Sequence, residues 1–153
     1  MMRSVLVAIL LSVSGIATAQ LPADAYRITP TKDAKAPLGV YIPTDLDDTF
    51  VELKKMLSPA MLHDFRIGPE KEMLNHHDGL GRWIRNNWML WQGSRLSKHF
   101  NDLGIDHPED MSVIILDSFW RHLNDRPIDV AGQVAYYQAY WAKVRREQPQ
   151  RGR

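Results

Sequence analysis

Residues that could bind or act on a ligand are concentrated in one stretch, HHDGLGRWIRNNWMLWQGSR, at positions 76–95. Its histidines and arginines donate hydrogen bonds, and its glycines leave backbone amides open where a helix should begin, which attracts anions. We therefore predict a site for an anionic ligand, formed by His76, His77, Asp78, Gly79, Gly81, Arg82, Arg85 and Arg95. The alternative is that Asp78 caps the helix itself and that the glycines only permit close packing.

Acid–base chemistry is a second possibility for the same stretch. Histidine exchanges protons near neutral pH, so His77 beside Asp78 could serve a small envelope hydrolase that uses a His/Asp pair near residues 76–82. No recognisable catalytic motif supports an enzyme, because Gly93-Ser94-Arg95-Leu96 is not a nucleophile elbow. Ser94 is better explained as a helix N-cap.

Metal binding is not favoured, although the chain contains six histidines. His76 and His77 are adjacent, and adjacent side chains diverge by about 100° on a helix. Neither HExxH nor a pair of histidines four to six positions apart occurs in the sequence. We therefore predict no metal site and no cofactor. The absence of cysteine also excludes thiolate ligands and a disulfide scaffold.

The first nineteen residues have the pattern of a secretory signal peptide. Arg3 precedes an apolar stretch from Val5 to Leu11, and Ala17 and Ala19 are the small residues that signal peptidase reads. The apolar core is too short to span a bilayer, so no stable membrane span is expected after cleavage. The sequence therefore predicts a secreted, periplasmic protein.

Cleavage would also change the charge of the chain. It removes Arg3 from the 19 lysines and arginines and none of the 18 acidic residues, so the mature chain is formally neutral. Proteins that bind nucleic acids have a strongly basic surface, and we therefore expect no nucleic-acid partner. An unknown envelope protein or an anionic envelope ligand is the partner that we expect.

The remaining chain divides into a flexible linker at 20–42, a helical domain at 43–145 and a polar tail at 146–153. Thr44 should cap the first helix, and Ser58-Pro59 should begin a second one that Gly68 ends. Further helix starts are marked by Ser94, His107-Pro108 and Asp129. These signals predict an all-α fold, a compact single-domain bundle of about five to six helices.

Two helices should form much of its surface and core. The segment 108–124 is apolar around most of its circumference, with Asp117 and Arg121 on a narrow polar side, which is typical of a buried helix. In the last helix, Tyr136 and Tyr140 lie off the apolar stripe and would suit a partner surface.

The helix after Gly81 should run to about Trp91. A helical wheel places Trp83, Asn87 and Trp91 on its apolar face, and it places Arg82 and Arg85 opposite. We expect Asn87 to be buried and to bond the backbone of a neighbouring element, because an unpaired buried amide costs about 1–3 kcal/mol.

The run H-x-GLG-x-WIRNNW-x-LW-x-GSRL, at residues 77–96, is followed by HP-x-DMS-x-IILDS at residues 107–118. Together these runs resemble a bacterial family of domains of unknown function, over about residues 43–141. The resemblance implies a helical domain, often behind a secretion signal, and it supplies no catalytic residues. We interpret the protein as a binding or protein-interaction domain.

Overall fold

The computed structural model describes residues 26–147, without the side chain of Leu74. Over this range the chain forms six α-helices, a 3-10 segment and a π-helical turn, and its only β-structure is two isolated bridges. The prediction of an all-α fold with five to six helices is confirmed. The predicted signal peptide, residues 1–19, and the tail residues 148–153 lie outside the described residues.

The elements follow one another with short connections. In chain order they are α1 Leu46–Met56, α2 Pro59–Ile67, η1 Glu70–His76, η2 His77–Gly81, α3 Arg82–Asn87, α4 Arg95–Asp102, α5 Pro108–Leu123 and α6 Val130–Glu147.

Polar caps define most of the helix starts. Ser58, Ser94 and Asp129 accept hydrogen bonds from the third residue that follows each of them, as the sequence predicts. The predicted cap at Thr44 is wrong by one position, because Asp45 accepts the Asp48 amide at 2.9 Å. That backbone hydrogen bond lowers the pKa of Asp45, since it stabilises the charged carboxylate.

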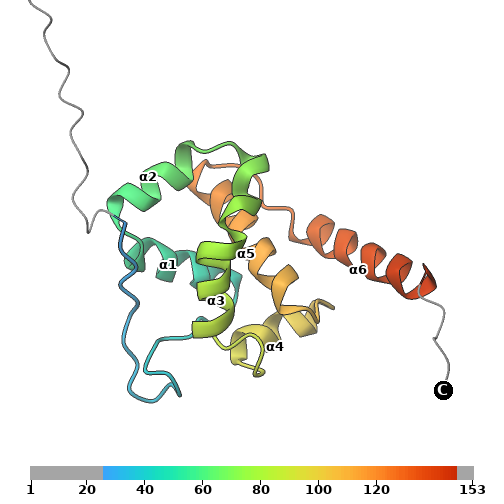
Figure 1. The fold of residues 1–153 in the computed structure, drawn as a ribbon, viewed down its shortest axis with the longest axis horizontal. Helices are drawn as coiled ribbons and strands as arrows, with labels where there is room; N and C mark the ends of the chain where they lie inside the picture. Colours follow the sequence, from blue (N-terminus) through green and yellow to red (C-terminus); the bar gives the residue numbers. More distant parts are fainter. Residues whose placement is uncertain (1–25, 148–153) are drawn as a thin grey trace, which may run out of the picture.

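Helix α5 is the centre of the domain. Nine of its sixteen residues are buried, and it contacts all the other helices as well as η1 and η2 (Figure 1). Phe119 packs against Phe50 of α1 and Phe65 of α2, with ring centroids 6.1 and 5.4 Å apart. The prediction of a buried helix at 108–124 is therefore confirmed.

The described part of the predicted linker, residues 26–42, lies against α1 and α2 without forming a helix. The Thr29 amide donates to Met56 O at 2.7 Å, and Thr31 donates its amide and its hydroxyl to the Glu52 carboxylate, each at 2.8 Å. These contacts hold the segment on the surface of the helical domain.

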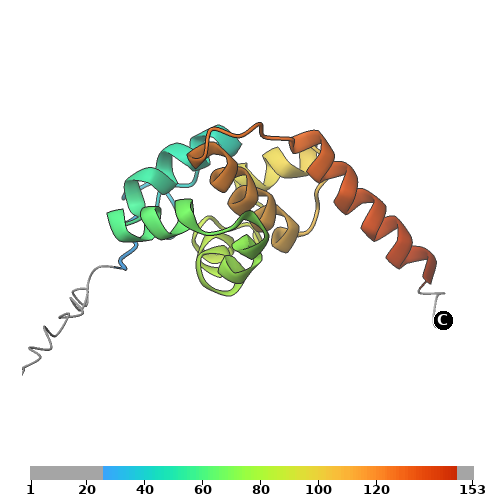
Figure 2. The ribbon, with the colours of Figure 1, turned by 90° about the horizontal axis from the view of Figure 1, so that it is seen from above.

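Helix α6 extends away from the other helices (Figures 1 and 2), and none of its residues is buried. It is held near its middle, where the Trp141 ring stacks on His107 at 3.7 Å and Trp141 Nε1 donates to Asp110 at 2.7 Å. None of the helices within residues 26–147 has the length and apolar character that crossing a bilayer requires.

Candidate functional site

The predicted helix start at Gly79 and Gly81 has a different form. His77–Gly81 form a π-helical turn that continues into α3, and Gly81 itself has helical dihedral angles. Asp78 therefore caps no helix, and its carboxylate instead faces Arg82 at 3.4 Å on the surface. The segment contains no open row of amides of the kind that a free helix start presents to an anion.

The sequence predicted the position of Arg85 wrongly. This residue was placed on a polar face, yet it is only 5% exposed, and it donates from Nη1 to Ser112 Oγ of α5 at 2.8 Å. The same Nη1 lies 3.2 Å from His77 Nδ1. Burial lowers the pKa of Arg85, because desolvation disfavours the cation.

The helical wheel failed because the segment is not one continuous α-helix. Within it only Arg82–Asn87 form an α-helix, which a π-helical turn precedes, so a wheel drawn through Trp91 gave the apolar face a wrong centre. Helix α3 then ends at Asn87, and the positive φ of Met89 redirects the chain, so Trp91 is 53% exposed rather than packed inside. Asn87 is half-buried and donates to Trp83 O of its own helix at 2.9 Å, not to a neighbouring element.

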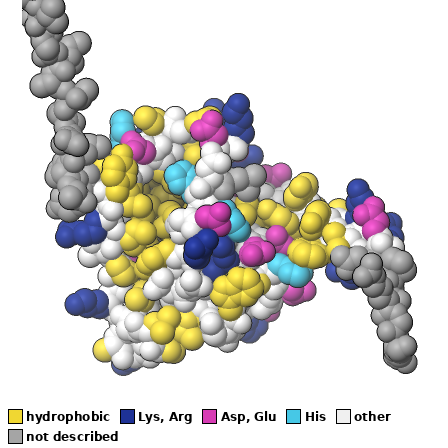
Figure 3. All heavy atoms as spheres, viewed as in Figure 1, with side chains coloured by type: hydrophobic (Ala, Val, Ile, Leu, Met, Phe, Trp, Pro, Cys, Tyr) yellow, Lys and Arg dark blue, Asp and Glu magenta, His cyan; other side chains and the backbone are white. Residues whose placement is uncertain are grey.

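The two histidines and Asp78 have separate partners. His76 packs on Phe65 with ring centroids 4.9 Å apart, and burial lowers its pKa. His77 faces Arg85, whereas Asp78 faces Arg82. In the view of Figure 3, acidic, basic and histidine side chains gather over the η2 and α3 segment. Their contacts give the proposed His/Asp pair no shared hydrogen bond.

Arg95 lies on α4 and has different neighbours from the other seven predicted site residues. Its Nε donates to Ile42 O at 2.6 Å, its Nη2 donates to the same oxygen, and its guanidinium lies 4.9 Å above the Tyr41 ring. These contacts fix the guanidinium in one orientation. They also join α4 to the segment that precedes α1.

Arg95 lines a hollow of about 490 Å³, here called the loop hollow. It lies between residues 33–37 and the turn 89–95, and Ala36, Pro37, Ile42 and Met89 give it an apolar lining. Its charged residues are Asp33, Lys35 and Arg95. Arg95 is the only residue lining the loop hollow that the sequence predicted as a site residue. The others could not be predicted, because only the fold brings residues 33–37 next to the turn 89–95.

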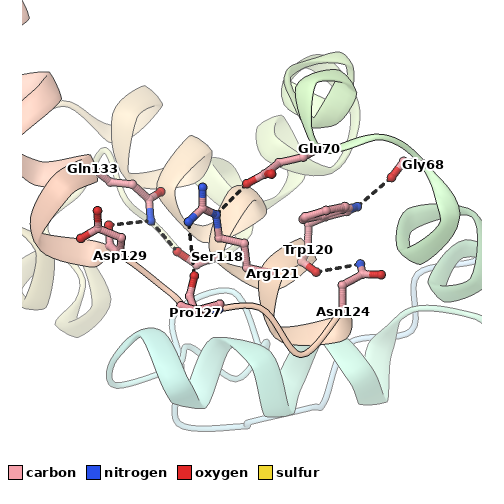
Figure 4. A network of polar contacts seen from close by, with 9 residues as sticks. All are labelled: Gly68, Glu70, Ser118, Trp120, Arg121, Asn124, Pro127, Asp129 and Gln133. Carbon is pink, nitrogen blue, oxygen red and sulfur yellow. Dashed lines mark hydrogen bonds and ion pairs between the residues drawn. The ribbon is translucent and has the colours of Figure 1, made fainter.

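A second hollow, here called the α5–α6 cleft, has a volume of about 430 Å³. Its lining residues are Val113, Asp117, Arg121, Asp129, Gly132, Gln133, Tyr136 and Tyr137. Figure 4 shows Arg121 between Glu70, which accepts from Nε at 2.7 Å, and Pro127 O, which accepts from Nη1 at 3.2 Å. The sequence analysis did not predict this cleft. The polar residues Asp117 and Arg121 on a largely apolar helix are the sequence feature that could have indicated it.

The structure therefore defines a small all-α domain built around α5. Residues 42–123, more than half of the chain, match the family described as domain of unknown function (DUF6794), and the chain belongs to this family. The resemblance to a family of unknown function is confirmed. Comparisons with curated proteins and with solved structures give no match. The matched residues include the turn 89–95 together with α3 before it and α4 after it, and they end before α6.

Proposed function

We propose that this protein is an exported binding domain whose loop hollow holds an anionic ligand that carries an apolar group. The observation that carries the proposal is the fixed guanidinium of Arg95 at the edge of a hollow of ligand size. Ligand sites in proteins are typically about 300–1,000 Å³, mostly apolar, with a few placed polar groups.

The position of Arg95 favours an anion. Its guanidinium is already held by Ile42 O and by the Tyr41 ring, so binding would order little more of the side chain. Lys35 adds a second cation to the hollow, against the single carboxylate of Asp33. The apolar side chains between these charges would contact the apolar part of the same ligand.

The backbone of the turn 89–95 supports a binding role. Met89 has a φ of +54°, one of two non-glycine residues with positive φ within residues 26–147. Such conformations cost of order 1–3 kcal/mol each and cluster at binding and catalytic sites. Met89 lines the loop hollow, so this strained residue lies where we place the ligand.

We favour binding over hydrolysis because His77 and Asp78 contact different arginines. We favour the loop hollow over an interaction surface on α6 because Arg95 and the turn that lines the hollow lie within the family domain, whereas Tyr136 and Tyr140 lie outside it. The signal pattern of residues 1–19 supports export, so the ligand would belong to the cell envelope.

Calorimetric titration with three probes tests the proposal. Octyl phosphate combines an anion with an apolar chain, octyl glucoside has the chain alone, and inorganic phosphate has the anion alone. Octyl phosphate should bind most tightly. Equal affinity for octyl phosphate and octyl glucoside would contradict an anion site.

Variants of the charged residues sharpen this experiment. Lys35→Gln should weaken octyl phosphate binding, and Asp33→Asn should tighten it, each by roughly two- to fivefold because solvent screens both charges. Lys98→Gln is the control, because Lys98 is an exposed lysine paired with Asp102 outside the loop hollow. A loss in Lys98→Gln as large as that in Lys35→Gln would show only a general effect of charge.

A further inference from the structure

Two hydrogen-bond acceptors that line the α5–α6 cleft have no donor among the described residues. Asp117 makes no hydrogen bond to any described residue, although its side chain is half-buried in the cleft. The Gln133 amide oxygen is buried and also accepts no hydrogen bond. Buried polar groups in proteins are normally paired, so two unpaired acceptors in one cleft require an explanation.

The cation of the cleft does not satisfy these acceptors. Arg121 donates from Nε to Glu70 and from Nη1 to Pro127 O. Asp129 caps α6 with Oδ1 only, which leaves its second carboxylate oxygen without a hydrogen bond. The lining of the cleft thus has two carboxylates, Asp117 and Asp129, and one cation, Arg121, which Glu70 already pairs. The cleft is therefore an electronegative environment.

Two aromatic rings line the same cleft. Tyr136 is 66% exposed, and its ring is nearly perpendicular to that of the half-buried Tyr137, with ring centroids 5.2 Å apart. Burial and the nearby carboxylates raise the pKa of Tyr137, so its ring stays a neutral phenol at physiological pH. The faces of neutral tyrosine rings attract cations within about 6 Å of their centroids.

We propose that the α5–α6 cleft binds an organic cation, an ammonium or guanidinium group, between the carboxylates of Asp117 and Asp129 and the ring of Tyr136. A guanidinium group carries five N–H donors and an ammonium group three, so either group could donate to the unpaired acceptors of the cleft. No group of three His, Asp or Glu side chains within residues 26–147 is arranged to hold a metal ion, so we propose an organic cation.

Cation binding at this position should depend on pH. The charged and titratable groups around Asp117 are Glu70 from η1, Arg121 from α5, Asp129 before α6, and the tyrosines of α6. Burial and the Glu70 charge raise the pKa of Asp117 to about 6, so protons compete with the cation below that pH. Affinity should therefore increase as the pH rises from about 5 to 7.5.

Titration with agmatine, which bears both an ammonium and a guanidinium group, tests this inference on the mature chain. The neutral diol 1,4-butanediol is the control ligand, and acetyl-Ala-Arg-Ala-amide distinguishes a peptide side chain from a free amine. At pH 7.5 Asp117→Asn should weaken agmatine binding by about tenfold, and it should remove most of the pH dependence. Tyr136→Ala should weaken binding by roughly two- to fivefold.

The matched control is Asp47→Asn, which removes an exposed carboxylate of α1 that does not line the cleft. It should leave agmatine affinity unchanged. Absence of agmatine binding, unchanged affinity in Asp117→Asn, or equal weakening in Asp47→Asn would each overturn the proposal. Tighter binding of the peptide than of agmatine would identify a basic side chain as the source of the cation, and the reverse would identify a free amine.

Discussion

Arg85 Nη1 and Ser112 Oγ are 2.8 Å apart, and this hydrogen bond joins α3 to the N-terminal half of α5. Ser112 is fully buried and donates its own proton to Glu109 O at 2.8 Å, so its oxygen is free to accept from the guanidinium. A buried cation thus has an uncharged acceptor and no carboxylate in direct contact. That acceptor therefore adds a polar contact to the apolar packing of the η2–α3 segment against α5.

Ser112→Ala should lower the free energy of unfolding by about 1–3 kcal/mol, because it removes an acceptor from a buried charged donor. Urea denaturation measures this loss. Ser97→Ala is the control, since Ser97 is equally buried but donates only to Ser94 O of its own helix turn and receives no guanidinium. Its loss should be smaller than that of Ser112→Ala. Equal losses in the two variants would show that the Arg85 contact adds no stability.

The sequence was sufficient where local signals define an element. Ser58-Pro59 begins α2 and Gly68 ends it, and His107-Pro108 begins α5, because capping and proline geometry depend on neighbouring residues only. The burial of α5 also followed from its composition. At Thr44 and Asp45, two adjacent capping residues compete, and the sequence could not distinguish them.

The sequence was insufficient where the helix changes type. A wheel drawn at 100° per residue assumes one α-helix, but α3 contains only Arg82–Asn87, between the π-helical turn at His77–Gly81 and the positive φ of Met89. Arg85 and Trp91 were consequently placed on the wrong sides. The site depended still more on tertiary structure, because the contact of Arg95 with Ile42 spans 53 positions.

Gly79 and Gly81 should respond differently to a methyl group. A Cβ at Gly81 would lie 3.2 Å from Arg85 Nη1 and 3.4 Å from Leu116 Cδ1, whereas a Cβ at Gly79 would meet nothing within 4 Å. Gly79→Ala should therefore raise the free energy of unfolding by about 0.4–1 kcal/mol through a less flexible unfolded chain. Gly81→Ala should not gain this stability. Thermal and urea denaturation of both variants measure the difference, and an equal gain at Gly81 would contradict the tight packing.

Export should leave Gln20, or its cyclised form, as the first residue of the mature protein. The prediction rests on the small residues Ala17 and Ala19 after the apolar stretch. Mass spectrometry of the protein recovered from the cell envelope determines the N-terminus. A variant with Ala19→Arg should remain uncleaved, because a large charged side chain does not suit the peptidase. Recovery of intact Met1 from wild-type protein would refute the signal peptide.

Asp117 should make stability depend on pH. Its folded pKa of about 6 exceeds the ordinary value of 3.8, so in this window the folded chain retains a proton that the unfolded chain releases. Stability is therefore lost as the pH rises through about 6. Asp117→Asn removes this titration without removing any hydrogen bond to a described residue. The variant should be more stable than wild type at pH 7.5, and the difference should vanish near pH 4.

Urea denaturation of wild type and Asp117→Asn at pH 4, 6 and 7.5 measures this difference. Burial also lowers the pKa values of His76 and His122, which opposes folding at low pH, but both histidines are present in both proteins and their effects cancel in the difference. A constant difference across the three pH values would mean that Asp117 does not titrate in this range. A more stable Asp117→Asn variant that also loses agmatine binding would show that the carboxylate is kept in the cleft at the expense of folding stability, as binding residues often are.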